Sequence, residues 1–576
     1  MNGKTGGTRL LRRGGALAVA AAVAVLTTAC GVVHVHFGSS GGSASTASAT
    51  YRAELAYSQC MRAHGLPGFP NPKPSGGPRL HQQLRLHSSV QLNGNPNSPA
   101  ARANDACKHL LPGGSTGTGA AAPTPSPPGA VSADCLASQP PSCDTPRQLR
   151  VAYGIQPLLN RGITGRGQTV VLLEFPPAPA ATGAQVPAVS DIRQDLARFD
   201  ALFGLPAARL QVVNTLAHVG SPWLAAAEEV GDTEIVHALA PGAVIREVLI
   251  PSPYTASIGK VSPAVVAAMR LGLAQGGVIE LSAGVGEQCF TPAEVAQWNS
   301  VLQAAQRDRV TVVISTGDNG AGITPCPGGT TSVKGVDLPA SDPLTLAVGG
   351  TSLRASRTTG AYMGETAWNT PPSEGGPAAG GGGFSRLFPR PAYQDGIAGI
   401  GATRGVPDVA ADADYQTGMA IAFSGGSHNY LFGGGGVSVA APLWAAVIAL
   451  ADQYAGHDLG FVNPALYRIG RSAYYHQAFH DVTTGTNSMT FPTQTITGYQ
   501  AAPGWDPVTG WGSPNAQVLV PLLARYVGPR PGHDAVAHSV RTTGTVWTPR
   551  TSWRSSAGTR RSQSGTIGGE RWRKPA

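Results

Sequence analysis

The chain has 576 residues, of which 42% are hydrophobic and 13% are charged, and its formal net charge is +9. The hydrophobic share is large enough for a sizeable core and excludes a wholly disordered chain. Residues 1–13 contribute four positive charges and residues 529–576 a net seven, so the rest of the chain carries a net charge of −2. Because the positive charge lies at the two ends, we expect no nucleic-acid groove in the middle.

The first thirty residues resemble an export signal. A basic stretch precedes the apolar run 14–29, which is too short to span a bilayer comfortably. The run closes on Ala29-Cys30, which is similar to the cleavage box of bacterial lipoproteins, although Thr27 stands where leucine is usual. We therefore expect a signal peptide over residues 1–30 and export to the cell surface or the extracellular space. Membrane attachment through a lipidated Cys30 and plain secretion are the two alternatives.

Composition divides the rest of the chain into five segments. Residues 31–50 are rich in Gly, Ser, Ala and Thr and predict a flexible tether. Residues 51–112 hold two helix-like stretches with one cysteine each, which predicts a small helical module. Residues 113–133 form a second linker, residues 134–528 form the main folded domain, and the polar, basic residues 529–576 predict a disordered tail.

Seven cysteines suit an exported protein, because six remain if Cys30 is lipidated and an even number can pair in an oxidising compartment. Free buried thiols are the alternative. The absence of a Cys-x-x-Cys pair disfavours a zinc ribbon or a thioredoxin-type site. The order of the cysteines along the chain suggests the disulfides Cys60–Cys107, Cys135–Cys143 and Cys289–Cys326.

Within residues 134–528, short apolar runs alternate with helical patterns. Strands are predicted at 168–173, 244–250, 277–282, 309–315 and 344–348, and helices at 263–276 and 291–307. Continuous apolar strands that alternate with helices predict an α/β fold, with a parallel β-sheet flanked by helices on both faces. In such sheets the functional residues gather at the carboxyl ends of the strands.

One serine combines a glycine-rich approach with a helix start. Four glycines, 433–436, precede Ser438, and a long apolar helical stretch follows with Pro442 expected in its first turn. A serine at a helix N-terminus lies beside backbone amides and a dipole that favour developing negative charge. Ser438 is therefore a candidate nucleophile, with a helix-capping serine as the alternative. The apolar run 437–451 is too short to cross a membrane.

Three carboxyl groups are candidates for acid–base work. Glu228 and Asp232 are spaced i,i+4 and share one helix face, where mutual repulsion raises one pKa and lets the pair share a proton. Such a pair is a general base with an orienting partner, although a solvated acidic helix face is the common alternative. Asp318 follows directly on a buried strand. It either forms a turn or, when protonated, donates a hydrogen bond to an oxyanion.

Together these stretches resemble the sedolisin family of serine-carboxyl peptidases over roughly residues 146–523. The same order and spacing hold for several further blocks, namely 146–153, 162–168, 338–343, 348–351, 381–386, 388–394 and 406–409. The resemblance implies a subtilisin-like α/β fold, preceded here by the small disulfide-linked helical module. It also implies an endopeptidase that hydrolyses peptide bonds through an acyl-enzyme.

The family's catalytic roles map onto four residues. The resemblance makes Ser438 the nucleophile, Glu228 its base, Asp232 the partner of that base and Asp318 the donor to the oxyanion. One departure is Val437, which stands where the family has threonine. A glutamate base that works with a protonated aspartic acid predicts an acidic pH optimum, because carboxyl groups titrate below imidazole.

The resemblance also implies one structural calcium ion near the C-terminal end of the domain. Its ligands would be the side chains of Asp481 and Asp506 and the backbone carbonyls of Val482, Ala502 and Gly504. Two carboxylates with several carbonyl oxygens suit a hard cation. Ala502 replaces a glycine, which leaves its backbone oxygen in place. A turn held only by the aspartates is the alternative.

We expect protein or peptide substrates, no nucleic acid and a monomer. A subtilisin-type Ser-His-Asp peptidase is disfavoured because the chain lacks a His-Gly-Thr motif, and only His237 lies near Asp232 in the sequence. The other alternative is a catalytically inactive, surface-tethered binding protein with a peptidase-like fold. Val437 is compatible with it, and so are residues 31–133, which are shorter than the family's pro-domain and do not resemble it.

Overall fold

The computed structural model describes most of the chain between residues 131 and 527. The described ranges are 131–138, 142–175, 189–215, 221, 223–250, 258–274, 276–326, 332–371, 377–425, 428–491 and 494–527, with residues 56, 59, 60, 62, 63 and 107. The predicted signal peptide with Cys30, the tether 31–50 and the tail 529–576 lie outside the described residues. Most of the predicted module 51–112 and of the linker 113–133 also lies outside them.

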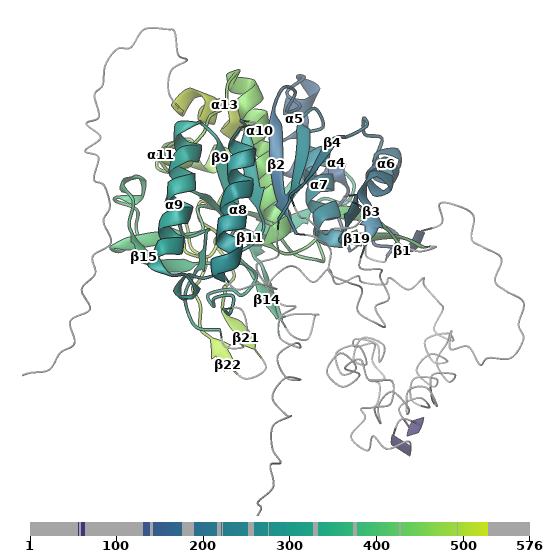
Figure 1. Ribbon diagram of the computed structural model, residues 1–576. Helices are drawn as coiled ribbons and strands as arrows, with labels where there is room; N and C mark the ends of the chain where they lie inside the picture. The colour runs from purple at the N-terminus through teal and green to yellow at the C-terminus, as the bar shows by residue number, and fades with distance from the viewer. Residues whose placement is uncertain are drawn as a thin grey trace, which may run out of the picture. The chain divides into compact units, whose positions relative to one another are not determined.

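An eight-stranded sheet forms the centre of the domain (Figure 1). Its strands follow the order β12-β11-β9-β7-β2-β6-β4, and β17 pairs with β11 off this path. All pairs are parallel except β11 with β12. The strands are β2 Thr169–Glu174, β4 Arg209–Asn214, β6 Val244–Leu249, β7 Val278–Leu281, β9 Thr311–Ser315, β11 Leu346–Ala355, β12 Tyr362–Ala367 and β17 Val409–Asp412. The prediction of a parallel sheet is confirmed.

All five apolar runs form strands of this sheet, but β11 extends past the predicted end at residue 348 to Ala355. Its second half pairs with the antiparallel strand β12 at the edge of the sheet. There, Ser352 is partly exposed and Arg354 is exposed. A strand that is covered on one face only does not read as a continuous apolar run, which is why the prediction stopped early.

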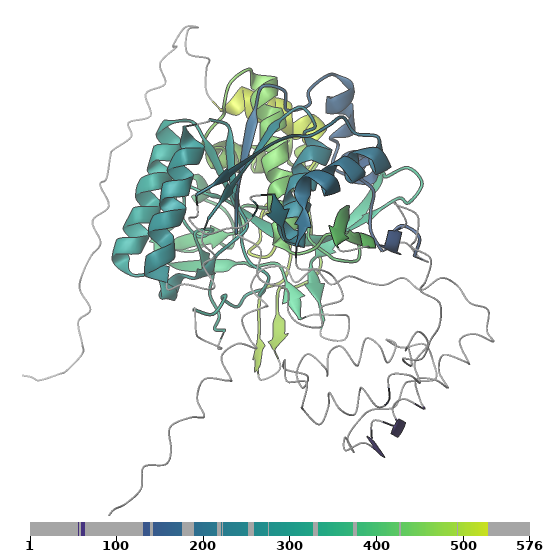
Figure 2. The same cartoon turned by 45° about the vertical axis from the view of Figure 1, so that its right-hand side comes forward.

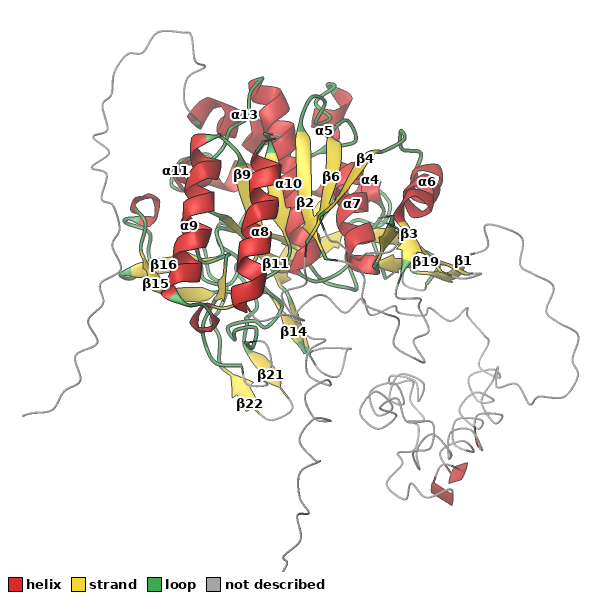
Figure 3. Ribbon diagram, in the orientation of Figure 1, coloured by secondary structure: helices red, strands yellow, loops and turns green. Residues whose placement is uncertain are grey.

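Helices cover both faces of the sheet (Figures 2 and 3). On one face lie α8 Ile258–Leu273 and α9 Pro292–Arg307, and on the other lie α7 Ala227–Leu239 and α10 Val437–Ala455. Successive residues of β2 point to opposite faces: Val170 and Leu172 join the core around α7 and α10, while Val171 and Leu173 join the core around α8 and α9. This double burial explains the uninterrupted apolar strand.

The remaining elements surround this three-layer core (Figure 3). The other helices are α4 Pro146–Ala152, α5 Gln156–Asn160, α6 Ile192–Phe203, α11 Asn463–Gly470, α12 Tyr475–Ala478 and α13 Ala516–Tyr526. The smaller strands are β1 Val131–Asp134, β3 Ser190–Asp191, β5 Leu224–Ala225, β8 Val285–Gly286, β10 Asp337–Leu338, β13 Asn369–Thr370, β14 Ala378–Ala379, β15 Gly383–Pro389, β16 Thr403–Val406, β18 Ala420–Gly425, β19 His428–Gly433, β20 Phe479–His480, β21 Met489–Phe491, β22 Gln494–Ile496 and β23 Ser513–Pro514.

Helix α10 is the one helix in the described part of the chain that is long and apolar enough to cross a membrane. It has 19 residues, and 89% of its most apolar stretch is buried inside the protein. Packing against α7 and the sheet accounts for its apolar composition. Pro442 lies in the second turn of α10, one turn further into the helix than the sequence predicted.

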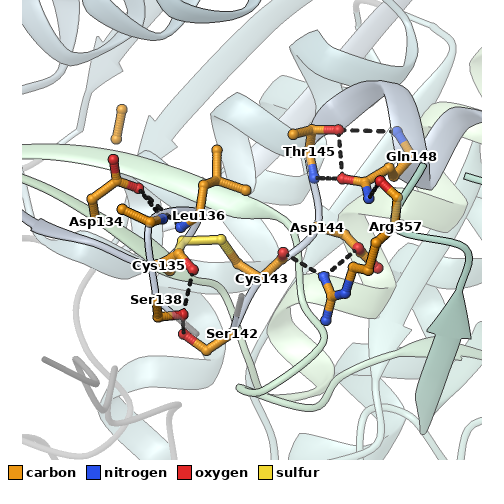
Figure 4. Close-up of a disulfide and its surroundings, with 12 residues drawn as sticks. Asp134, Cys135, Leu136, Ser138, Ser142, Cys143, Asp144, Thr145, Gln148 and Arg357 are labelled. Atoms are coloured by element: carbon orange, nitrogen blue, oxygen red, sulfur yellow. Dashed lines mark hydrogen bonds and ion pairs between the residues drawn. A yellow bond between two sulfur atoms is a disulfide. The ribbon is translucent and has the colours of Figure 1, made fainter. Parts of the chain in front are cut away.

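All three predicted disulfides are present, with Cα–Cα distances of 5.7, 5.6 and 5.3 Å for Cys60–Cys107, Cys135–Cys143 and Cys289–Cys326. These distances are usual for a disulfide. Figure 4 shows the second bridge, beside the ion pair in which Arg357 Nη1 lies 2.7 Å from Asp144 Oδ1.

The strand β1 leads into this second bridge. It pairs in parallel with β19. Because β1 begins at Val131, it takes in the last three residues of the predicted linker 113–133. The chain is therefore fixed to the domain slightly earlier than its composition indicated.

Candidate active site

The candidate nucleophile and its base come from the N-terminal turns of two packed helices. Ser438 is the second residue of α10 and Glu228 is the second residue of α7. Ser438 Oγ donates a hydrogen bond to Glu228 Oε1 at 2.8 Å, although 210 residues separate the two in the chain. Ser438 is buried and Glu228 is partly buried. A serine hydroxyl and a carboxylate at this distance have the geometry of a nucleophile with its general base.

The glycines before α10 are required by the protein's own packing. Gly436 has a φ of +90°, a backbone conformation that side chains disfavour. A Cβ atom on Gly435 would lie 2.0 Å from the ring of Tyr415. The glycine run therefore lets the chain pass close to Tyr415 and turn into the helix that presents Ser438.

Asp318 lies at the same helix start. It follows β9, and its Oδ1 accepts a hydrogen bond at 2.9 Å from the backbone N–H of Val437, the residue before Ser438. Burial raises the pKa of Asp318 to about 6. Below that pH the group is a neutral acid beside Ser438, which is the form that can donate to an oxyanion.

The departure at Val437 does not disturb this contact. Val437 offers Asp318 its backbone N–H, which a threonine would offer equally. Its side chain is buried, and one of its methyl groups lies close to Gly350. The side chain at position 437 therefore contributes to core packing. The hydrogen bond to Asp318 comes from the backbone N–H and does not depend on the type of side chain.

Asp232 lies one turn after Glu228 on α7 and also faces carboxyl groups from two strands. Carboxyl oxygens of Asp232, Glu174 and Glu280 all lie within 4.8 Å of one another, and all three residues are buried. Among the described residues, Asp232 Oδ2 has no hydrogen-bond donor. Burial raises the pKa of Asp232 well above its usual value, and repulsion from Glu174, Glu280 and Glu228 raises it further.

The pKa of Glu228 is also raised. Burial is the main cause, the neighbouring carboxyl of Glu229 adds to it, and the hydrogen bond from Ser438 acts in the opposite direction. The start of α7 favours a negative charge through the helix dipole, but desolvation outweighs it here. Some of these carboxyl groups therefore stay protonated, and the net negative charge of the group is smaller than the number of its acids.

The sequence reasoning missed Glu174, Glu229 and Glu280 as members of this group. Glu280 was visible, because it interrupts the apolar run 277–282, and a buried carboxyl needs a partner or a proton. Glu174 ends β2 in the same way. What the sequence did not show is that these strands bring both residues next to Asp232.

His237 does not take the position of a catalytic histidine. Its Nε2 lies 2.9 Å from Asp200 Oδ1 and 2.8 Å from the carbonyl oxygen of Pro206. Asp200 belongs to α6. The ring is thus engaged with residues of α6 and of the loop that follows it, and Ser438 has a carboxylate as its hydrogen-bond acceptor.

The five residues expected to bind calcium lie on two neighbouring loops. The backbone N–H of Gly504 donates to both carboxylate oxygens of Asp481 at 3.2 Å, and that of Ala502 donates to Asp506 Oδ2 at 3.0 Å. The carbonyl of Val482 is linked to the second loop by the hydroxyl of Thr509 at 3.5 Å. Two carboxylates and carbonyl oxygens held together in this way fit a hard cation that takes six to eight oxygen ligands, with water completing the set.

The fold and the arrangement around Ser438 define the class: an α/β protein with a serine–carboxyl centre at the start of a buried helix. No family model matches the chain. Kumamolisin from Bacillus sp. (strain MN-32) is 33% identical over 388 residues, which cover 66% of this chain and 63% of kumamolisin. Sedolisin from Pseudomonas sp. (strain 101) is 33% identical over 219 residues, which cover 37% of this chain and 35% of sedolisin.

A solved structure extends the comparison to the fold. Pseudomonas sedolisin, a serine-carboxyl proteinase complexed with two molecules of pseudo-iodotyrostatin, matches with a TM-score of 0.54 and 25% identity. The match covers 67% of this chain and 99% of that chain. The sequence and structural matches together support the sedolisin family for this chain. It spans 63% of kumamolisin and 35% of sedolisin, less than two thirds of these curated relatives.

Proposed function

We propose that this protein is an exported, acid-acting serine-carboxyl endopeptidase. The observation that carries the proposal is the 2.8 Å hydrogen bond from Ser438 Oγ to Glu228 Oε1, with Asp318 at the same helix start. Membership of a family of named peptidases supports it. Protein or peptide chains are the substrates.

In the proposed reaction, Glu228 takes the proton of Ser438 as Oγ attacks the carbonyl carbon of the scissile bond. Neutral Asp318 donates a hydrogen bond to the oxyanion, and the proton held by Glu228 passes to the leaving amine. An acyl-enzyme on Ser438 results. Water, activated by the same Glu228, then releases the acyl group and restores the serine. Asp232 acts through Glu228 by keeping a proton available beside it.

The carboxyl groups set the proposed pH range. Asp318 must be protonated to donate, and because burial raises its pKa to about 6, activity is expected to fall as the pH rises through about 6. On the acid side, the group around Glu228 must lose one proton. Mutual repulsion among these carboxyls raises the pKa for loss of further protons far more than for the first, so one negative charge is available at acidic pH.

A calcium ion would be held by Asp481, Asp506 and the carbonyls of Val482, Ala502 and Gly504. It would supply structural cross-linking of two loops and no chemistry at Ser438. Sedolisin-family membership is consistent with such a site.

Export is proposed from the signal-like residues 1–30 and from the disulfides, which persist in oxidising compartments. The protein is then either anchored through a lipidated Cys30 or secreted. Mass spectrometry of the mature N-terminus distinguishes the two, because a lipidated Cys30 would be the first residue.

Digestion of a peptide library between pH 3 and pH 8 tests the function. We expect cleavage inside peptides at acidic pH by the wild-type protein, complete loss with Ser438→Ala, and normal activity with the control Ser472→Ala, whose hydroxyl donates to the carbonyl of Ile469 and accepts from the backbone N–H of Tyr474. Both variants should retain the wild-type melting temperature. Turnover by Ser438→Ala would exclude Ser438 as the nucleophile. A wild-type protein that neither cleaves nor reacts with a peptide aldehyde at any pH would be a binding protein instead.

A further inference from the structure

A buried carboxyl on the central strand lies behind the candidate base. Glu280 is in the middle of β7, fully buried, and it belongs to a different layer from α7, which carries Glu228 and Asp232. Its chain neighbours Ile279 and Leu281 point to the opposite face of the strand, where they join the apolar core around α8 and α9. An acidic residue is retained there against a substantial desolvation cost.

Each oxygen of Glu280 has a distinct environment. Ser282 Oγ donates to Oε1 at 2.7 Å. Oε2 has no donor among the described residues, and neither have Glu174 Oε1 and Asp232 Oδ2. Carboxyl oxygens of these three residues lie within 4.8 Å of one another. Carboxylates cannot donate to each other, so a buried group of this kind is stable only when protons occupy some of its oxygens.

The charges that face Glu280 are all acidic. They are Glu228 and Asp232 from α7 and Glu174 from β2. The next charges, Glu229 and Glu247, act on Glu174 and are acidic too. Within the described part of the chain, none of the main electrostatic partners of Glu174, Asp232 or Glu280 is Lys, Arg or His. With no cation to balance it, burial keeps Glu280 protonated, and its pKa is raised to about 8.

We propose that Glu280 is a positioning residue of this active site: it stays a neutral acid whose proton is directed toward Asp232 and Glu174, and it thereby stabilises the one negative charge that Glu228 and Asp232 share. The inference rests on the proposed function. It adds to the three acids of the serine–carboxyl centre a fourth, on β7, that touches neither substrate nor Ser438.

The chemical consequence concerns the acid limb of the pH–rate profile. A neutral acid that donates toward a charged carboxyl favours the charged form. Replacement by a side chain without a donor makes the first proton harder to remove. The acid limb of kcat/KM then moves to higher pH, by about half a unit to one unit.

The experiment compares Glu280→Met with Glu280→Gln in the full-length protein, using one peptide substrate between pH 2.5 and pH 7. Methionine matches the length of glutamate but cannot donate, whereas glutamine donates through its amide without titrating. We expect kcat/KM on the acid limb to fall about three- to tenfold for Glu280→Met, which is the same shift expressed as a rate. Glu280→Gln should restore the limb to within about twofold of wild type, because the donor returns.

Glu234→Met is the matched control. Glu234 is a buried acid on α7 whose pKa is also raised by burial. Its Oε2 accepts a hydrogen bond from the backbone N–H of Ala422, and it is not one of the three grouped carboxyls that include Glu280. This variant should lose stability without moving the acid limb. If Glu280→Met does not fold, Ser282→Ala takes its place, because loss of the hydrogen bond that orients Glu280 should move the limb in the same direction by less.

Two results would overturn the inference: an acid limb that stays in place in Glu280→Met, or one that moves equally in the methionine and glutamine variants. Inactivity of the wild-type protein is a different result, because it contradicts the proposed function itself. The protonation of Glu280 then still has a readout without catalysis. Between pH 5 and pH 8 the melting temperature should fall less in Glu280→Gln than in wild type, because glutamine has no proton to lose on unfolding.

Discussion

At the scale of single residues, the centre depends on two contacts made by side chains whose usual properties are altered by burial. The hydroxyl of Ser438 has a carboxylate acceptor, and the carboxyl of Asp318 has a backbone donor one residue away from that hydroxyl. The amide of Val437 fixes Asp318, so the missing threonine hydroxyl removes no contact with it. This residue-scale geometry favours the active peptidase over the inactive binding protein.

Asp318 offers a prediction in two variants. Asp318→Ala removes the donor to the oxyanion and should lower kcat about 10²- to 10³-fold with little change in KM. Asp318→Asn keeps a donor that does not titrate, so it should retain more activity and lose the fall above about pH 6 that the raised pKa of Asp318 predicts. Steady-state kinetics from pH 3 to pH 8 check both. An unchanged alkaline limb in Asp318→Asn would assign that limb to another group.

At the scale of elements, two helix starts and one strand end meet at the carboxyl edge of the sheet. Helix α7 presents Glu228, α10 presents Ser438, and the segment after β9 presents Asp318. Because α7 and α10 pack along the same face of the sheet, they fix the distance between base and nucleophile. The loops around Asp481 and Asp506 are a separate element, joined by backbone donors to carboxylates.

Removal of calcium should act on stability. A ligand that binds only the folded state at a hundredfold excess over its Kd contributes about 2.7 kcal/mol, so chelation with EGTA should lower Tm by about 5 °C or more, and added Ca²⁺ should restore it. Asp481→Asn should reproduce the loss and make Tm insensitive to EGTA. The control Asp395→Asn, at an exposed ion pair with Arg390, should keep the full response. A wild-type Tm that EGTA does not change would argue for turns held by the aspartates alone.

At the scale of the whole molecule, the core contains many acids without cations to balance them. Burial raises the pKa of Glu247 and Asp337 to about 7, and that of Glu280 to about 8. Their unfolded values are near 4. Between about pH 4.5 and pH 8 the folded state therefore holds more protons than the unfolded state, and the free energy of unfolding falls as the pH rises.

Thermal unfolding of the inactive Ser438→Ala protein, which cannot digest itself, checks this at saturating Ca²⁺. We expect Tm to be several degrees lower at pH 8 than at pH 5, because each such group contributes up to about 1.4 kcal/mol per pH unit within its window. His480 acts oppositely: burial lowers its pKa to about 4, so the stability it contributes is lost as the pH falls from about 6.5 to 4. Because the raised acids outnumber this histidine, Tm should be highest at or below about pH 5. A Tm that is constant or rises from pH 5 to pH 8 would contradict the buried-acid account.

The parallel sheet, its central strands and the three disulfides could be predicted from the amino-acid pattern alone. Apolar runs covered on both faces and a small, ordered set of cysteines are local signals, so they can be recognised without the fold. The edge strand β4 and the second half of β11 were not predicted. The residues of β4 are exposed or only partly buried, and those in the second half of β11 alternate between buried and more exposed positions. The candidate residues Ser438, Glu228 and Asp318 were named from motifs, since each lies beside an element boundary that the sequence marks.

How these residues meet depends on the packing of the whole domain. The role of Asp232 as the partner of Glu228 stays a prediction, but the structure adds Glu174 and Glu280, from two other elements, beside Asp232. Their proximity follows from the strand order β7-β2-β6 with α7 packed across it, and strand order is not written in any local pattern. The raised pKa values have the same origin, because desolvation is a property of the assembled core and of no segment alone.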